Sequence, residues 1–196
     1  MPADERDRVT DYPHLVLPLI TLGDPRRLSG GYLYHLRMAD AAPAHEARIC
    51  FLSFPEWPFP LAALRGTALL RRSEKLGASA VLLDSIAAAF AAPALVTRRL
   101  RVPVIAVVHQ PPGGIDHGAR RARAQEPLDR LALRRADVLI AASDHLAEQL
   151  VEAGFARSRI RVVPPGRDVA PPPEGPVQDL RNGRRAAFLT VANWLP

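Results

Sequence analysis

The run from Ala136 to Asp168, ADVLIAASDHLAEQLVEAGFARSRIRVVPPGRD, constrains the fold most, because it contains two strands and the helix between them. Val138 to Ala142 is continuously apolar, which suits a strand covered on both faces. Ser143 is placed to cap the N-terminus of a helix, and Gly154 supplies the left-handed residue that ends such helices. The second strand, Ile160 to Val163, stops at two prolines. A strand, a short helix and another buried strand predict a parallel crossover unit.

The preceding chain repeats this alternation of apolar strands and amphipathic helices. Four further strands are predicted, at His14 to Ile20, Ala47 to Ser53, Ser79 to Ile86 and Val102 to Val108. Four helices are predicted between them, at Tyr32 to about Asp40, Leu61 to Leu76, Ser85 or Ile86 to Leu100, and Arg120 to Arg135. Pro18 predicts a bulge or a sheet edge, and Pro127 predicts an interruption or the start of its helix. The predicted fold class is α/β, a Rossmann-like three-layer sandwich with a mainly parallel sheet.

The length and composition suit one folded domain together with shorter segments outside it. A chain of 196 residues, 48% of them hydrophobic, can bury one sizeable core. Residues 1–13 are polar and are expected to be a disordered leader, and residues 14–168 are expected to form the Rossmann-like domain. Residues 169–185 hold four prolines and suit a semi-rigid linker. Residues 186–196 begin a fresh apolar strand and the chain stops there, so we expect a truncated piece of a longer protein.

The positive charge comes almost wholly from arginine. The net charge is +6, the isoelectric point is about 10.6, and Lys75 is the only lysine. Three interpretations stay open: a solvated surface, attraction to an anionic membrane, and steering of an anionic substrate into a cleft. Nucleic acid is disfavoured because zinc-finger, aromatic RNA-binding and basic-zipper patterns are missing. No apolar run reaches about 18 residues and no signal sequence is visible, so we predict a cytoplasmic protein, with peripheral contact to the inner face of the membrane left open. Cys50 is the only cysteine, which excludes an internal disulfide.

A glycine pair follows the loop after the first predicted strand. Gly30 and Gly31 precede a predicted helix, and a helix N-terminus behind glycines can bind an anion through exposed backbone N–H groups. The pair can equally be a structural turn. The loop does not fit G-x-G-x-x-G, which disfavours a nicotinamide enzyme.

His109 stands at the carboxyl end of the most apolar predicted strand. Ligands of doubly wound sheets bind at that edge, where imidazole can hydrogen-bond a sugar hydroxyl or a phosphate. The alternative is a histidine that only satisfies loop backbone groups. Asp84 ends the preceding strand and either faces the same crevice or caps a helix, and Asp116 lies in the loop after His109. The six histidines show no metal-ligand spacing, so no metal is predicted.

These motifs, in this order, resemble the first domain of glycosyltransferase family 4. The resemblance is carried by the alanine-aspartate start, the strand ending in serine, the helix ending in glycine and the proline-glycine elbow of Ala136 to Asp168, by Gly30-Gly31, and by the V-x-H pattern at Val107 to His109. Arg167 departs from it, because the family more often has a small apolar residue there. The segment after His109, QPPGG, also departs.

The resemblance implies a function for the chain as the acceptor-binding half of a GT-B enzyme. Such an enzyme moves a sugar from a nucleotide-diphosphate sugar to an acceptor hydroxyl with retention, and it needs no metal or other cofactor. His109 would hydrogen-bond near the reacting sugar, and Gly30 and Gly31 would face the donor diphosphate. Asp116, Ser143 and Arg167 are further candidates for donor or acceptor contacts. The acceptor would be a sugar, a lipid or another small molecule, and the chain alone is expected to be inactive.

Two alternatives stay open. One is a non-enzymatic binding module, either a relic or a subunit that pairs with a separate donor-binding domain. The coding DNA beyond the last codon would separate them, since a continuing frame with a basic glycine loop and spaced glutamates favours the enzyme. The other is a Rossmann domain of another superfamily, such as a nucleotide-sugar epimerase. The missing dinucleotide glycines and the missing tyrosine-lysine pair argue against it.

Overall fold

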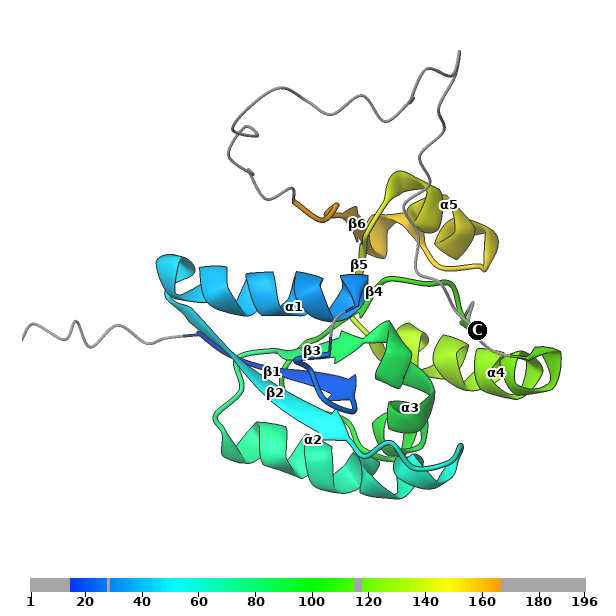
Figure 1. Ribbon diagram of the computed structural model, residues 1–196, viewed down its shortest axis with the longest axis horizontal. Helices are drawn as coiled ribbons and strands as arrows, with labels where there is room; N and C mark the ends of the chain where they lie inside the picture. Colours follow the sequence, from blue (N-terminus) through cyan, green and yellow to red (C-terminus); the bar gives the residue numbers. More distant parts are fainter. Residues whose placement is uncertain (1–14, 28, 115–117, 167–196) are drawn as a thin grey trace, which may run out of the picture. The chain divides into compact units, whose positions relative to one another are not determined.

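The computed structural model describes residues 15–27, 29–114 and 118–166. The chain divides into two units, Met1–Pro165 and Gly166–Pro196, and only Gly166 of the second falls within the described residues. The expected leader, the linker at 169–185 and the strand at 186–196 therefore lie outside them. All the described helices and strands belong to the first unit, coloured from blue to orange in Figure 1.

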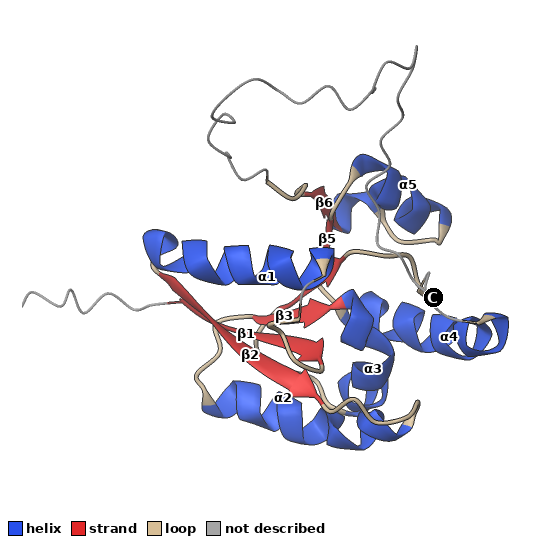
Figure 2. Cartoon of the chain, in the orientation of Figure 1, coloured by secondary structure: helices blue, strands red, loops and turns tan. Residues whose placement is uncertain are grey.

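The first unit contains a sheet of six parallel strands, drawn in red in Figure 2. In sheet order the strands are β2 (Ala47–Phe54), β1 (Leu15–Leu22), β3 (Val81–Asp84), β4 (Val104–Val108), β5 (Val138–Ala141) and β6 (Ile160–Val162). The order reverses between β1 and β3, because β2 lies on one side of β1 and all later strands lie on the other. That reversal is the topological switch point, where ligands of open parallel sheets bind. The predicted α/β Rossmann-like fold is confirmed.

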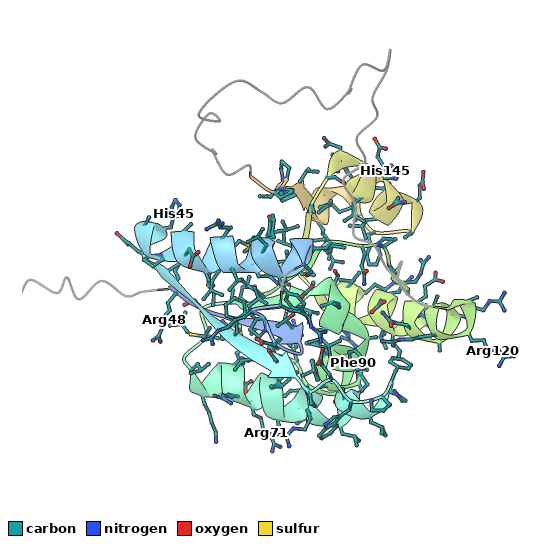
Figure 3. All side chains as sticks on the ribbon, viewed as in Figure 1. His45, Arg48, Arg71, Phe90, Arg120 and His145 are labelled. Carbon is teal, nitrogen blue, oxygen red and sulfur yellow. The ribbon has the colours of Figure 1, made fainter. Side chains whose placement is uncertain are left out.

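Helices cover both faces of the sheet. They are α1 (Gly30–Ala41), α2 (Gly66–Lys75), α3 (Ala88–Thr97), α4 (Ala119–Arg135) and α5 (Asp144–Glu152). Figure 1 shows α1 along one face and α2 and α3 along the other. The buried residues of α2, α3, α4 and α5 join the strands in one hydrophobic cluster. Phe90 of α3 points into this cluster, whereas Arg71 and Arg120 project outward from their helices (Figure 3).

Strand alternation decides which side chains face α1. Ile20, Leu83 and Val108 belong to the cluster beneath α2, α3 and α4. Because neighbouring residues of a strand point to opposite faces, Thr21 and Asp84 point toward α1. The same alternation continues past Val108, so His109 also points toward α1. The α1 face therefore receives the polar side chains at the strand ends.

The predicted effects of two prolines are wrong. Pro18 lies within a regular inner strand, in register with Cys50 of β2. Pairing of β1 with β3 begins only at Leu19, so the missing N–H of Pro18 leaves no gap in that ladder. Pro127 lies inside a continuous α4, on its exposed side, where water can satisfy the carbonyl group that loses its partner.

The boundaries of some elements also differ from the prediction. The predicted helix at Leu61 to Leu76 begins as a 3-10 turn, Leu61–Arg65, before α2. β3 has four residues, because backbone pairing with β4 starts at Val81 and a 3-10 turn begins at Ser85. The predicted end of α5 is confirmed, with Gly154 at a φ of 86°.

Candidate functional site

Four polar side chains meet beneath α1 at the switch point. Thr21 of β1 and Asp84 of β3 lie at equivalent heights, because Ile20 pairs with Leu83. His109 follows the end of β4, and His35 comes down from α1. Thr21 and His35 have no exposed surface, and Asp84 is 3% exposed. The strand ends thus bring to one place residues that lie far apart in the sequence.

Asp84 is held at both carboxylate oxygens. Oδ2 accepts a hydrogen bond of 2.6 Å from the Thr21 hydroxyl, and Oδ1 accepts one of 3.1 Å from the backbone N–H of Ile86. The second bond caps the 3-10 turn after β3. Burial raises the pKa of Asp84 to about 7, although the two hydrogen bonds act in the opposite direction. Asp84 therefore changes protonation state near neutral pH.

His35 lies between Asp84 and His109. Its Nδ1 is 3.6 Å from Asp84 Oδ2, and its Nε2 is 3.0 Å from His109 Nε2. Nδ1 is buried and has no hydrogen-bond partner among the described residues. Burial, and then the nearby His109, lower the pKa of His35 to about 3. His35 is therefore neutral at pH 7, and its contact with Asp84 is not an ion pair.

His109 is fixed by contacts on several sides. Its backbone N–H donates to Ser85 Oγ at 3.1 Å, and its ring meets the ring of Tyr34 edge to face at 5.1 Å between centroids. The Tyr34 hydroxyl donates to the carbonyl of Val163 at 3.0 Å. Burial lowers the pKa of His109 to about 4. A neutral imidazole can donate or accept a hydrogen bond near pH 7, and it carries no charge.

The glycine pair lies beside His109. A Cβ atom on Gly31 would lie 3.4 Å from His109 Cδ2, and one on Gly30 would meet no atom of the described residues within 4 Å. Neither residue has a positive φ, so neither the backbone nor packing requires glycine at these positions. Ser29 caps α1 by accepting from the N–H of Tyr32 at 3.4 Å. The first N–H groups of α1 and the imidazole are therefore at the same edge of the sheet, as the sequence predicts.

The other predicted contacts are not brought to this cluster by any described interaction. Ser143 lies after β5 at the same edge, where its hydroxyl accepts from the N–H of Leu146 at 3.2 Å and caps α5. Asp116 and Arg167 lie outside the described residues. The roles of all three in binding stay predictions.

Sequence reasoning missed Thr21 and His35, and it left Asp84 undecided. From the sequence, Thr21 looks like the first residue of a turn-rich loop. His35 looks like an ordinary polar residue on a helix whose predicted role is packing. The signal that could have found them is the alternation of side chains between the two faces of a strand, which places Thr21 and Asp84 on the same face of the sheet. His35 follows Tyr32 by three residues, which puts it on the buried stripe of α1.

His35, Asp84 and His109 carry atoms that could bind a metal, all within 4.8 Å of one another. The three side chains nevertheless lie in a row, with His35 between Asp84 and His109, rather than around one point. The two nitrogens of His35 face different partners, and a single ion cannot bind both. Both oxygens of Asp84 already accept hydrogen bonds. The arrangement therefore suits proton positioning better than metal binding.

A second feature lies at the amino ends of β4 and β5. A cavity of about 630 Å³ is lined there by Arg98, Arg99, Arg101, Arg134 and Arg135, with Asp137 as its acidic member. Asp137 accepts from the N–H of Val104 at 2.8 Å, and Arg98 pairs with Glu74. The cavity is thus strongly basic. Within the described part of the chain, no helix is both long and apolar enough to cross a bilayer.

Comparison with known proteins gives a consistent result. Residues 19–170 match the model of Glycosyltransferase Family 4. The apo form of the lipopolysaccharide outer core galactosyltransferase WaaB aligns with a TM-score of 0.60 and 14% identity over 82% of this chain and 49% of its own. The Anabaena protein Alr3699/HepE, in complex with UDP, aligns with a TM-score of 0.51 and 16% identity over 79% of this chain and 44% of its own. The chain thus spans about half the length of these structures. No curated protein sequence gives a significant match.

Proposed function

Because the chain belongs to glycosyltransferase family 4, we propose that it is the acceptor-binding half of a retaining glycosyltransferase. The enzyme moves a sugar from a nucleotide-diphosphate sugar to a hydroxyl of a sugar, lipid or small-molecule acceptor. The described chain supplies one wall of the cleft, at the carboxyl ends of β1, β3 and β4.

The observation that supports this proposal most is the closeness of Gly31 and His109. The N-terminus of α1 offers N–H groups to an anion, and the missing side chains of Gly30 and Gly31 leave room for a diphosphate. The same N–H groups stabilise the charge that develops on the departing diphosphate, so the proposed reaction uses no metal or other cofactor. His109, neutral at pH 7, hydrogen-bonds a hydroxyl of the reacting sugar. The donor's own phosphate takes the proton of the acceptor hydroxyl.

We also propose that the arginine-lined cavity contacts the anionic inner surface of the membrane. Each arginine near such a surface contributes about 1 kcal/mol of binding free energy. Five arginines line this cavity, and one of them, Arg98, is already paired with Glu74. The cavity lies at the amino ends of the strands, and the cleft lies at their carboxyl ends. A lipid-linked acceptor would suit an enzyme held at this surface.

The test is a titration of the full chain with inorganic pyrophosphate, followed by backbone amide NMR. We expect shifts at Gly30, Gly31 and Tyr32, and smaller shifts in the histidine variant His109→Ala. His45→Ala is the matched control, because His45 is exposed and ends a 3-10 turn away from the cleft. Shifts confined to the arginine-lined cavity would contradict the diphosphate site. The chain alone should show no turnover with nucleotide sugars, and a rate of about 1 per second would contradict its role as a half enzyme.

A further inference from the structure

The two histidines beneath α1 share one hydrogen bond. His35 Nε2 and His109 Nε2 are 3.0 Å apart, so one nitrogen donates and the other accepts. A neutral imidazole carries one proton on its two nitrogens. If His109 Nε2 donates, His35 must hold its proton on Nδ1, toward Asp84. If His35 Nε2 donates, His109 must hold its proton on Nδ1. The tautomers of the two rings are therefore coupled.

Asp84 acts on the far end of this pair. Its Oδ2 is 3.6 Å from His35 Nδ1, and that nitrogen has no hydrogen-bond partner within the described part of the chain. At this distance the contact is electrostatic rather than a hydrogen bond: an ionised carboxylate attracts a proton on Nδ1, whereas a carboxyl group protonated at Oδ2 favours an unprotonated Nδ1. The other groups facing this chain are Thr21 on β1, Tyr32 and Tyr34 on α1, and Ser85 after β3. Arg27 and Glu56 act electrostatically on Tyr32.

We propose that Asp84 and His35 are positioning residues that decide whether His109 offers an acceptor or a donor to the ligand. With Asp84 ionised, His35 holds its proton on Nδ1, His109 holds its proton on Nε2, and His109 Nδ1 accepts a hydrogen bond. With Asp84 protonated, both tautomers reverse and His109 Nδ1 donates. When Asp84 is protonated, one proton enters at His109 Nδ1 from the ligand or water, the Nε2 proton of His109 passes to His35 Nε2, and the Nδ1 proton of His35 passes to Asp84. One proton is taken up in total, and both rings stay neutral. This deepens the role proposed for His109 and rests on that proposed function only for the identity of the ligand.

Several observations support this coupling of Asp84, His35 and His109. His35 is completely buried, so water cannot take the place of Asp84 beside its Nδ1. Both histidines have pKa values well below 7, whereas the pKa of Asp84 is about 7, so Asp84 is the group that titrates near neutral pH. Thr21 and the N–H of Ile86 hold the carboxylate in place, so a change of its charge is not absorbed by rotation.

The first experiment uses the wild-type chain. Histidine ring nitrogens are followed by long-range proton–nitrogen NMR, and the Asp84 carboxyl carbon is followed in the same samples between pH 5.5 and pH 8.5. We expect the protonated and unprotonated nitrogens of both rings to exchange places with one shared midpoint, that of Asp84, near pH 7. A titration of Asp84 without a tautomer change would overturn the proposal. So would imidazolium formation at that midpoint.

The second experiment uses Asp84→Asn. The N–H of Ile86 holds the amide oxygen at the Oδ1 position, so the amide NH₂ replaces Oδ2 and donates toward Thr21 and His35. We expect His109 to hold its proton on Nδ1 at every pH from 5.5 to 8.5. Retention of the wild-type tautomer at pH 8.5 in the folded variant would contradict the proposal.

A double variant separates transmission through His35 from a direct effect. In His35→Gln the side-chain amide can donate to or accept from His109, but it no longer couples the proton of His109 to Asp84. Asp84→Asn should then leave the His109 tautomer unchanged in the His35→Gln background. An equal change in both backgrounds would show that His35 is not needed. The tautomers could prove to be coupled while no phosphate or sugar ligand changes the NMR signals of His109. In that case the positioning role of Asp84 and His35 would hold and the proposed function would fail.

Discussion

At the carboxyl ends of the strands, Thr21, His35 and Asp84 are at most 3% exposed, and the Thr21 hydroxyl donates a hydrogen bond to Asp84. At the amino ends of the same sheet, exposed arginines surround a cavity of about 630 Å³. Burial shifts the pKa values of His35, Asp84 and His109 in the first region strongly. This contrast is the reason that the proposals above assign sugar transfer to the carboxyl ends of the strands and membrane contact to the amino ends.

The largest expected effect that sharpens this contrast is acid sensitivity. A buried histidine with a lowered pKa contributes stability that is present above its unfolded pKa of 6.5 and is lost as the pH falls toward the folded value. Asp84 acts oppositely, since its raised pKa contributes stability below 3.8 that is lost as the pH rises through about 7. Between pH 6.5 and 4.5 the wild-type chain should lose about 2 kcal/mol of unfolding free energy, and Asp84→Asn should lose about 4 kcal/mol. Urea unfolding at each pH measures both values.

The control for this prediction is His145→Gln, because His145 is exposed on α5 and should leave the pH dependence unchanged. His109→Gln removes one of the two opposing histidines and should make the wild-type profile nearly flat. A steep loss in His109→Gln would show that the acid sensitivity comes from elsewhere in the chain.

The next prediction concerns the basic end. Arg134→Ala combined with Arg135→Ala removes two charges from the cavity at the end of α4, and each is worth about 1 kcal/mol near an anionic membrane. Binding to vesicles that contain anionic lipid should fall about 30-fold, and added salt should reduce the difference. Arg120→Ala combined with Arg123→Ala removes two exposed charges from the other end of the same helix. Equal losses in the two double variants would mean that only net charge matters.

Thr21→Val tests how the buried residues at the carboxyl ends of the strands hold the carboxylate of Asp84. The change keeps the shape of a fully buried side chain and removes the 2.6 Å hydrogen bond to Asp84. Because bonds to an ionised carboxylate are stronger, we expect a loss of about 1–2 kcal/mol at pH 8 and a smaller loss at pH 5. The pKa of Asp84 should rise further, since the Thr21 bond lowers it. Thr97→Val is the control, because Thr97 is exposed and should cost little.

The same contrast explains how far the sequence could go. Apolar runs such as Val104 to Val108 identify the strands and their order along the chain, and a histidine after such a run falls at the ligand edge. The partner of His109 was harder to find, because His35 meets His109 only where α1 crosses the sheet. Thr21 meets Asp84 only through the pairing of β1 with β3. Pro18 misled for a related reason, since its effect depends on which strand lies beside it. The arginines of the cavity come from the segment after α3 and from the end of α4, and they have no common spacing in the sequence.

The smallest effect expected is at Gly30, where stability and binding should change in opposite directions. Gly30 opens α1 with a Cβ position that meets nothing, so Gly30→Ala should raise the unfolding free energy by about 0.5 kcal/mol. The added methyl group should also weaken pyrophosphate binding, because it occupies the space that the glycine leaves before the helix N–H groups. Gly77→Ala is the matched control, since its φ of 70° makes alanine strained there and should lower stability by about 1 kcal/mol without changing binding. A Gly30→Ala chain that is more stable and binds pyrophosphate unchanged would remove the reason for placing a diphosphate at this helix.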